Sequence, residues 1–493
     1  MLIRLDRNHS TPLYQQIIDE VKHHIDRGAL DIGHSLPSSR KLAEILGVNR
    51  TTVNRAYEEL QALGFLSSRP GSYHRVQKRR KEVAYDPDRA SLIPWSEISS
   101  EPARQIHEMF LRYSPEQPRL ASVPEDIINI SRLDLDPRLF PMTEFKRCTG
   151  SVLAQSDADS LQYGDYRGFL PLRQLIAQRL RLHGIAASSE EILITNGAQQ
   201  AIDLLCRIFV RPNTKVAIET PTYANILPLL KFVRAEMAEI PMTDEGMDLD
   251  CLDSALRRDT VSFVYTIPNF QNPTGITTSH EHRERLFTIC AKHRVPIVED
   301  GFEEDMKYFG KVPLPIKSID ESNIVIYLGT FSKALFPGLR IGWVTADRDC
   351  ISRMTAVKRF SDLTSSQFVQ MIMHEFIRQG YYDRQLKRLH RIFRKRMQLA
   401  LAKMDACFPP EIAWTKPAGG YTIWVKLPAK LGEGRLHERM LQHGVIVSPG
   451  TYYFPHKKKS EYFRISISRL NESEIGEGLS RAGRALHQMV GGH

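Results

Sequence analysis

Lys333 lies in a stretch whose residue types suit covalent chemistry on a phosphate-bearing aldehyde. An apolar run at 324–328 predicts a buried strand, and it is followed by Thr330, Ser332, Lys333 and Arg340. Burial near other cations lowers the pKa of a lysine, so that its neutral amine can condense with an aldehyde. Hydroxyls and an arginine beside it can hold a phosphate. We therefore interpret Lys333 as a Schiff-base lysine for pyridoxal 5′-phosphate (PLP); the alternative is a solvated surface lysine.

Side chains that could bind such a cofactor follow other apolar runs of the chain. A glycine turn at Gly197 opens a helix, and a helix N-terminus offers backbone N–H groups to an anion. Tyr223 can stack on a pyridine ring, Asn272 supplies an amide, and a carboxylate at Asp300 can hold the pyridine nitrogen protonated. Arg464 can clamp a carboxylate with two parallel hydrogen bonds. Each residue alone is weak support, and Tyr223 alone fits a core aromatic equally well.

Five strand-like runs must position these side chains, and helical stretches lie between several of them. The runs are 192–195, 215–218, 262–266, 296–299 and 324–328. Strands that alternate with helices predict a mostly parallel sheet with helices on both faces, and ligands of such sheets collect at the carboxyl ends of the strands. The candidate residues follow those ends in order. Residues 128–493 are therefore expected to form one α/β domain that binds PLP.

The first 77 residues have a different pattern, with three short helices and two short strands. Apolar residues recur every four positions from Ile17, the second helix opens at Ser38, and it ends at Gly47. A third helix follows the turn Val48-Asn49, and strands at 65–67 and 73–76 flank a turn at 69–72. We expect a winged helix-turn-helix (α+β) over residues 1–77, with the third helix in the major groove of DNA. The alternative is a small helical interaction domain.

Charge is concentrated in this N-terminal part of the chain. The whole chain has a net charge of +10, and residues 1–81 alone contain 14 Lys and Arg against 8 Asp and Glu, a net +6. This balance allows an acidic partner such as nucleic acid. The basic run 78–81 and the proline-rich residues after it predict a linker over 78–127.

The cysteines and the distribution of apolar residues indicate the cellular compartment. The six cysteines are scattered and form no C-x-x-C pair, which indicates a reducing compartment and argues against a disulfide framework or a metal site. The N-terminus has no signal-like apolar region, and no apolar run approaches the ~18 residues of a membrane span. We therefore expect a cytoplasmic protein without a membrane partner.

The N-terminal sequence LPSSRKLAEILGVNRTTVNRAYEELQALGFLSSRPGSY resembles the DNA-binding domain of the GntR family of bacterial regulators. The resemblance implies double-stranded DNA, at a promoter or operator, as the partner. The wing tip is expected to contribute Arg69 beside the residues that match the family's DNA-contacting positions, which are Arg40, Arg50, Thr51, Thr52, Asn54 and Gly71.

The larger part resembles fold type I aminotransferases, and the whole chain resembles the MocR subfamily of GntR-type regulators. By this resemblance Lys333 forms the internal aldimine with PLP, Asp300 pairs with the pyridine nitrogen, and Asn272 pairs with the ring hydroxyl oxygen. Tyr223 stacks on the ring, and Arg464 takes the carboxylate of a substrate or effector. Catalytic roles would fall to Lys333 and Asp300. The phosphate is implied to be held by Ala198, Gln199, Thr330, Ser332 and Arg340.

The resemblance also implies a head-to-tail homodimer, in which Tyr163 reaches the phosphate of the neighbouring subunit. Three departures stand out. Phe302 replaces a tyrosine that donates to the ring hydroxyl in many relatives, which should raise the aldimine pKa. Asn225 stands where a GABA-sensing relative has a second arginine, and the segment 130–134 lacks the glycine usual before the Asp-Pro-x-Leu-Phe-Pro run.

Three functions are consistent with the sequence. The first, which we favour, is a transcription regulator that senses PLP or an amino compound and has at most residual aminotransferase activity. The second is a working aminotransferase on a 2-amino acid such as 2-aminoadipate. The third is a DNA-binding protein whose large domain is a PLP-free dimerisation scaffold. Salt-dependent binding to a specific duplex without multiple turnover separates the first from the second.

Overall fold

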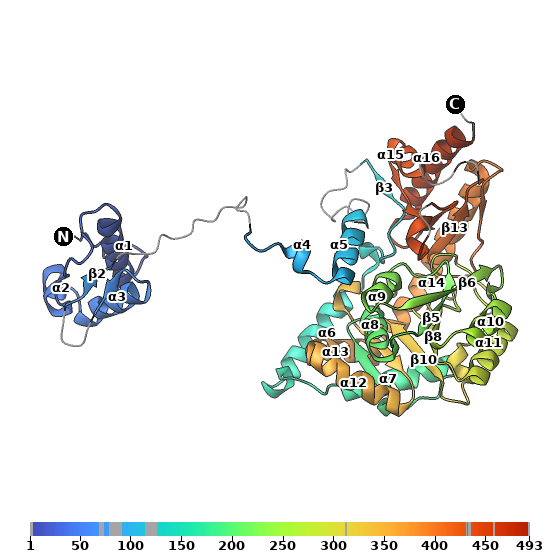
Figure 1. The fold of residues 1–493 in the computed structure, drawn as a ribbon, viewed down its shortest axis with the longest axis horizontal. Helices are drawn as coiled ribbons and strands as arrows, with labels where there is room; N and C mark the ends of the chain where they lie inside the picture. The colour runs from blue at the N-terminus through green and yellow to red at the C-terminus, as the bar shows by residue number, and fades with distance from the viewer. Residues whose placement is uncertain are drawn as a thin grey trace. The chain divides into compact units, whose positions relative to one another are not determined.

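The chain folds as two compact units, Met1–Pro94 and Trp95–His493, which are described separately. The computed structural model describes residues 3–68, 73–77, 91–113, 126–310, 313–429, 431, 435–456 and 459–491. The expected linker contains two helices, α4 (Trp95–Ile98) and α5 (Glu101–Tyr113), and both belong to the larger unit, where α5 packs on α9 (Ile226–Phe232). Figure 1 shows the elements of each unit along the chain.

The small unit has the winged helix-turn-helix fold. Its helices are α1 (Leu13–Asp26), α2 (Ser39–Leu46) and α3 (Arg50–Ala62), and strands β1 (Leu66–Ser67) and β2 (Arg75–Val76) pair antiparallel. Ser38 caps α2 by accepting a hydrogen bond from the backbone N–H of Lys41, and Gly47 ends it in the left-handed conformation. The inner faces of the helices bury a shared apolar core that includes Ile17, Val21, Val53 and Tyr57.

An eight-stranded sheet forms the centre of the large unit. Its strand order is β4-β11-β10-β9-β8-β5-β6-β7. Neighbours from β10 through β9, β8 and β5 to β6 are parallel, whereas β11 runs antiparallel between β10 and β4. The strands are β4 (Ile192–Thr195), β5 (Lys215–Thr220), β6 (Glu236–Thr243), β7 (Gly246–Met247), β8 (Val261–Thr266), β9 (Ile297–Asp300), β10 (Val325–Thr330) and β11 (Gly342–Thr345).

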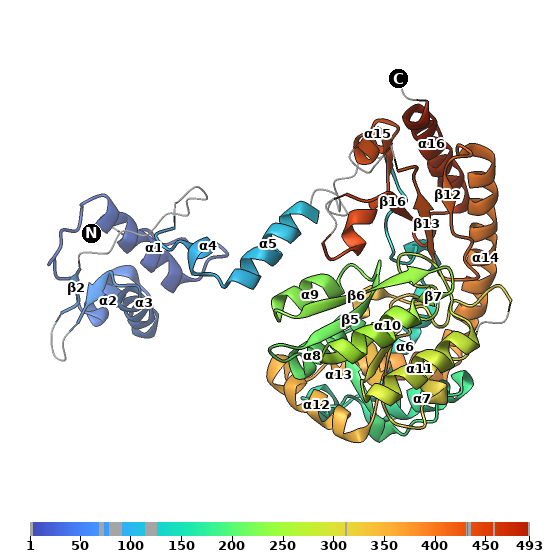
Figure 2. The ribbon, with the colours of Figure 1, turned by 45° about the vertical axis from the view of Figure 1, so that its right-hand side comes forward.

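Helices cover both faces of this sheet because its strands are apolar on both sides. In β4, Leu193 packs with α8 (Ala198–Phe209), α9 and α12 (Arg348–Asp362), whereas Ile192 and Ile194 pack on the other face with α7 (Leu170–Leu180). Farther along the sheet, α10 (Leu249–Arg258) and α11 (His280–His293) cover that second face. Figure 2 shows α10 and α11 side by side. This is the α/β fold with a mostly parallel sheet that the sequence predicts.

A second, antiparallel sheet follows near the C-terminal end of the chain. Its order is β12-β13-β16-β15, and the long helix α14 (Tyr381–Cys407) packs along α16 (Glu472–Val490) beside it (Figure 2). A parallel pair joins β3 (Ile128–Asn129) to β14 (Val445–Ile446). The remaining elements are α6 (Met142–Gln155), α13 (Gln367–Arg378), α15 (Leu436–Gln442), β12 (Ala413–Trp414), β13 (Thr422–Lys426), β15 (Ser448–Pro449), β16 (Tyr462–Ser466) and short 3-10 turns, among them η2 (Asp159–Leu161) and η6 (Pro337–Leu339).

Within the described ranges, no helix combines the length and the apolar composition needed to cross a membrane.

Candidate functional site

A cavity of about 110 Å³ lies at the carboxyl ends of the parallel strands. Every cofactor residue expected from the sequence lines it except Tyr163, which lies after η2 with its side chain 78% exposed. The strand order places the ends of β4, β9 and β10 along one edge, so residues distant in sequence meet there. The lining residues are Leu133, Ala198, Gln199, Tyr223, Ile267, Asn272, Asp300, Phe302, Thr330, Ser332, Lys333 and Arg340.

Lys333 follows β10 and brings its amine into this cavity. The Nζ donates a hydrogen bond of 2.8 Å to the backbone carbonyl of Leu133 and lies 5.8 Å from the centre of the Phe302 ring. Burial lowers the pKa of Lys333, and the charge of Arg464 lowers it further, while Glu303, Asp134 and Asp300 oppose this effect. A lowered pKa increases the neutral fraction of the amine, which is the nucleophilic form.

Asp300 is the last residue of β9 and is buried. Its Oδ2 accepts a hydrogen bond of 2.6 Å from the hydroxyl of Tyr265, whereas its Oδ1 is buried without a hydrogen-bond partner. Burial raises the pKa of Asp300 to about 6, although the hydrogen bond from Tyr265 and the charge of Lys333 act in the opposite direction. A buried carboxylate with one unpaired oxygen suits a cationic N–H donor of a ligand.

The opposite end of the cavity is built to hold an anion. Gly197 has φ +80° and precedes the first turn of α8, whose N-terminal N–H groups have no partners within the helix. The guanidinium of Arg340 donates to the carbonyl of Asn196 at 3.0 Å, beside that turn. The hydroxyls of Thr330 and Ser332 lie 3.0 Å apart on the same edge of the sheet. Backbone amides, hydroxyls and a guanidinium together form a phosphate-type site.

The Tyr223 side chain is held by two amides. Its hydroxyl donates to Gln199 Oε1 at 3.1 Å and accepts from Asn225 Nδ2 at 3.0 Å. Burial raises the pKa of Tyr223 to about 12, so its ring remains a neutral phenol. The ring is therefore fixed in one orientation beside the cavity.

Arg464 comes from β16 of the second sheet and reaches the edge of the first. Its NH1 donates to Asn272 Oδ1 at 2.9 Å and its NH2 donates to the carbonyl of Ser131 at 2.6 Å. The side chain is buried, and its Nε has no hydrogen-bond partner. Both partners are neutral, so the charge of Arg464 is available to a carboxylate.

Three residues of the site were not found from the sequence. Tyr265 orients Asp300, but in the sequence it is one more aromatic residue of a strand. Leu133 lines the cavity and accepts from Lys333, a contact across 200 residues that no local pattern indicates. Glu303 is buried near Lys333 with Oε1 unpartnered, and burial raises its pKa. The signal for Glu303 was its position three residues after Asp300, in the loop that follows β9.

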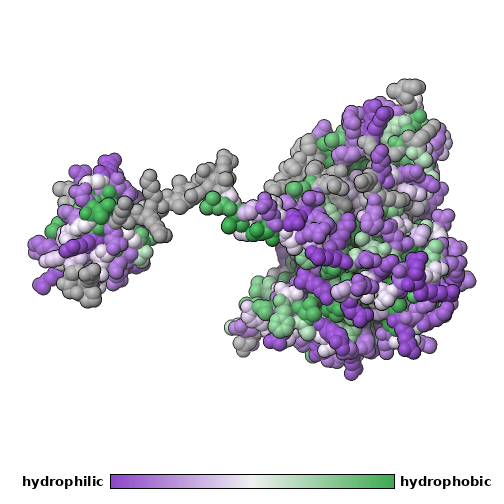
Figure 3. Space-filling model, viewed as in Figure 1, coloured by the Kyte–Doolittle hydropathy of each residue, from purple (hydrophilic) through white to green (hydrophobic). Residues whose placement is uncertain are grey.

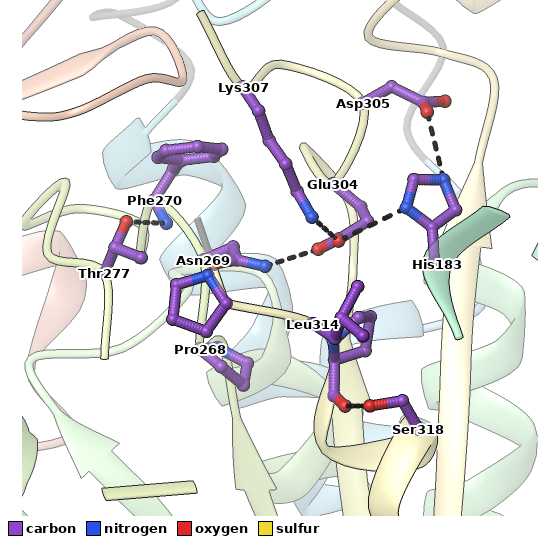
Figure 4. Close-up of polar contacts among 12 residues, drawn as sticks. His183, Pro268, Asn269, Phe270, Thr277, Glu304, Asp305, Lys307, Leu314 and Ser318 are labelled. Carbon is purple, nitrogen blue, oxygen red and sulfur yellow. Dashed lines mark hydrogen bonds and ion pairs between the residues drawn. The ribbon is translucent and has the colours of Figure 1, made fainter. Parts of the chain in front are cut away.

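A buried polar cluster anchors the loop that follows β9. Glu304 accepts hydrogen bonds from Asn269 Nδ2 and Lys307 Nζ, and His183 lies 3.6 Å from Glu304 and 3.5 Å from Asp305. Figure 4 shows these side chains converging on Glu304. Charge-assisted hydrogen bonds in a buried setting hold the loop in one conformation, which fixes Phe302 against the 110 Å³ cavity.

The candidate DNA-contacting residues lie on α2 and α3. Arg40, Arg50 and Thr51 are exposed, and Thr52 and Asn54 are partly exposed on the first turns of α3. Arg55 is engaged in contacts within the small unit, because its guanidinium lies 3.8 Å from the centre of the Tyr14 ring and contacts Glu59. The predicted wing residues Arg69 and Gly71 lie outside the described residues.

Comparisons with known proteins identify both parts of the chain. Residues 134–481 match the family of class I and II aminotransferases, and residues 13–76 match the bacterial regulatory proteins of the gntR family. The uncharacterised HTH-type transcriptional regulator YisV of Bacillus subtilis is 30% identical over 486 residues, which cover 98% of each chain. Aromatic-amino-acid aminotransferase 1 of Thermococcus litoralis is 34% identical over 369 residues, 74% of this chain and 88% of that protein.

A solved structure agrees with these matches. LysN, an α-aminoadipate aminotransferase of Thermus thermophilus complexed with N-(5′-phosphopyridoxyl)-L-leucine, superposes with a TM-score of 0.73 at 30% identity. The match covers 81% of this chain and 100% of that chain. The chain therefore belongs to the class I and II aminotransferase family and, through its GntR-type head, to the MocR-like group of helix-turn-helix transcription regulators.

Proposed function

We propose that the chain is a PLP-dependent DNA-binding transcription regulator. It binds PLP covalently through Lys333, as an internal aldimine, and senses PLP or an amino compound to control transcription. The observation that carries the proposal is a single cavity lined by Lys333, Asp300 and Ala198, which follows the Gly197 turn, in a chain with a GntR-type head. The phosphopyridoxyl group of the LysN complex supports PLP as the cofactor.

Each residue of the cavity has a role that fits PLP. The unpaired Oδ1 of Asp300 is available to the pyridinium N–H, the amide of Asn272 to the ring oxygen, and the fixed ring of Tyr223 to the pyridine face. The Lys333 nitrogen forms the C=N bond to the aldehyde carbon, and the aldehyde oxygen leaves as water. When bound, PLP supplies an electron sink next to the amine of a ligand.

The phosphate end gives one test of this assignment. Gly197→Ala should lower the affinity for PLP at least about tenfold, because the added Cβ would collide with the Arg340 guanidinium and the backbone has φ +80°. Affinity for pyridoxal, which lacks the phosphate, should fall much less. Titrations with both compounds measure the difference.

Gly338→Ala is the matched control, since a Cβ there meets nothing within 4 Å although Gly338 lies in η6, two residues before Arg340. Equal losses for PLP and pyridoxal in Gly197→Ala would show that the turn does not hold the phosphate.

Phe302 gives a second test, through a pKa. Its ring is buried and lines the cofactor cavity. Phe302→Tyr should lower the pKa of the C=N nitrogen that joins the cofactor to Lys333, because a hydroxyl that donates to the ring oxygen draws its electron density away from that nitrogen. The absorbance of the bound cofactor, followed against pH, should then change at a lower pH than in the parent protein. An unchanged titration would mean that position 302 does not approach the ring oxygen.

The proposal includes a head-to-tail homodimer in the cytoplasm. Apolar and aromatic side chains are exposed on and around α6, η2 and the end of α12, among them Leu153, Leu161, Tyr163 and Phe360. Figure 3 shows pale and green residues at the lower left of the large unit, where Figure 1 places α6. Such a patch favours a subunit interface. The six cysteines are free, which fits a reducing compartment.

A working aminotransferase on a 2-amino acid such as 2-aminoadipate is the second candidate. The observation that favours it is the set of polar side chains around Lys333, together with Arg464, whose two hydrogen bonds go to neutral oxygens. In a regulator, the chain would exist in two arrangements, and an amino ligand would change their populations only if it bound one of them more tightly than the other. In the enzyme, the same ligand would be turned over many times.

The deciding experiment is a mobility shift of the purified protein on DNA upstream of its own gene, with and without PLP, beside an absorbance spectrum. A specific shift that PLP modulates, with visible absorbance from the Lys-bound cofactor, is expected. Visible absorbance without a specific shift, together with fast turnover of an amino donor, would move the conclusion to the aminotransferase.

A further inference from the structure

A second, larger cavity adjoins the cofactor cavity. It measures about 640 Å³, within the range of about 300–1,000 Å³ typical of small-molecule sites. The two cavities share Leu133, Tyr223, Asn272 and Lys333. A ligand in the larger cavity can therefore bring an amine to Lys333. The other lining residues are Asn129, Ser131, Arg132, Asp134, Ala224, Asn225, Pro337, Val447, Ser448, Pro449, Tyr452, Tyr453 and Arg464.

Arg464 provides one binding site for an anionic group in this cavity. Arg464 is only 7% exposed, and its two hydrogen bonds go to neutral oxygens of Asn272 and Ser131. Its Nε has no hydrogen-bond partner. Among the described residues no carboxylate accepts a hydrogen bond from this guanidinium, although it lies 5.3 Å from the centre of the Tyr453 ring, so it favours a ligand carboxylate.

Arg132, the other arginine that lines the cavity, already has a carboxylate partner. Its Nε and NH2 donate to the two carboxylate oxygens of Asp134 at 2.9 and 3.0 Å, and Arg469 donates to the same carboxylate at 2.6 Å. Asn225, which also lines the cavity, is a neutral amide that donates to the Tyr223 hydroxyl. A second carboxylate in the ligand would have to compete with Asp134 for the donors of Arg132.

The remaining walls suit an apolar group. Val447, Pro449 and Ala224 present aliphatic surface, and the Tyr453 ring is buried with its hydroxyl shared with Ser448 at 2.8 Å. Behind this ring, Trp424 packs edge-on to Tyr453 with the ring centres 5.4 Å apart. A rigid aromatic wall of this kind favours aromatic or bulky aliphatic partners.

We infer that the amino compound recognised here is an amino acid with one carboxylate and a large aromatic or aliphatic side chain, in preference to dicarboxylic or small amino acids. Arg464 takes its carboxylate, Lys333 marks the position of its amine, and the wall around Tyr453 takes its side chain. The inference rests on the proposed function, because it assumes a cofactor on Lys333.

The test uses the full-length, PLP-loaded protein titrated with phenylalanine, leucine, glutamate, 2-aminoadipate and 4-aminobutyrate, followed by calorimetry and by cofactor absorbance. Phenylalanine or leucine should bind at least about tenfold more tightly than the other three. Asp134→Asn should free Arg132 and raise the affinity for glutamate about tenfold relative to the affinity for phenylalanine. Asp349→Asn, which removes a carboxylate 70% exposed on α12, is the matched control and should change neither.

The outcomes separate the inference from the function beneath it. Tighter binding of glutamate than of phenylalanine by the parent protein overturns the inference. So does Arg132→Gln if it lowers glutamate affinity selectively, since Arg132 would then already bind a second carboxylate. The inference is also overturned if the PLP-loaded protein shifts the mobility of its DNA but binds none of the five compounds. The proposed function would then still stand. A protein that takes up no PLP overturns the proposed function itself.

Discussion

Lys333→Ala should abolish the visible absorbance of protein-bound PLP while the protein stays folded. Among the described residues that line the cofactor cavity, Lys333 alone carries an amine, so no other group there can form the C=N bond. Burial already lowers its pKa, which prepares the amine for that reaction. The free energy of unfolding should fall by only about 1 kcal/mol, because the Nζ makes one hydrogen bond, to the backbone carbonyl of Leu133.

The measurement is an absorbance spectrum of dialysed protein, with circular dichroism and thermal unfolding to check the fold. Lys292→Ala is the matched control, since Lys292 is 59% exposed on α11 and lines neither cavity. It should keep the spectrum of the parent protein. If Lys333→Ala retained the absorbance after dialysis, Lys333 would lose its assigned role, and another lysine would have to be sought.

Arg50→Ala should weaken binding to the specific duplex by about 1–3 kcal/mol, roughly 5- to 150-fold, and leave PLP binding unchanged. Arg50 is the first residue of α3, the helix that the winged fold presents to the major groove. Its side chain is exposed, and its one hydrogen bond, to the Ser39 hydroxyl, is long at 3.5 Å. The side chain is therefore available to a base edge or a phosphate.

Fluorescence anisotropy at several salt concentrations separates the two kinds of contact. Loss of a phosphate contact reduces the salt slope by about 1 and weakens all sequences alike, whereas loss of a base contact relaxes specificity at one position. Arg27→Ala, an exposed arginine at the C-terminal end of α1, is the matched control. Unchanged affinity in Arg50→Ala would count against α3 as the recognition helix.

The central strands could be predicted because each is a short apolar run bounded by polar residues. The predicted run 192–195 coincides with β4, and the other four runs begin and end within two residues of β5, β8, β9 and β10. Side chains that follow strand ends could be predicted to share an edge, because parallel strands end together. This argument placed the Gly197 turn, Asp300 and Lys333 at one edge, and the family resemblance added Ala198; Ala198, Asp300 and Lys333 line one cavity in the structure.

Long-range features could not be predicted in this way. Strand β11 is four residues long, begins with glycine, and carries no local sign that it inserts antiparallel between β10 and β4. The direction of β11 explains why Arg340 lies at the cavity, because a residue just before an antiparallel strand lies at the carboxyl edge of the neighbouring parallel strands. The bond from Tyr265 to Asp300 and the contact of Leu133 with Lys333 likewise depend on tertiary packing.

The order in which the chain is synthesised separates its two units in time. The small unit ends at Pro94, whereas Arg464 contacts Ser131 across 333 residues of sequence and so completes the ligand site only when β16 has been made. At bacterial elongation rates this interval is roughly tens of seconds. A chain that stops before β16 would therefore carry a folded DNA-binding head without a ligand site. If the chain acts as proposed, such a product would keep the candidate DNA-contacting residues of α2 and α3 but could not bind the amino ligand.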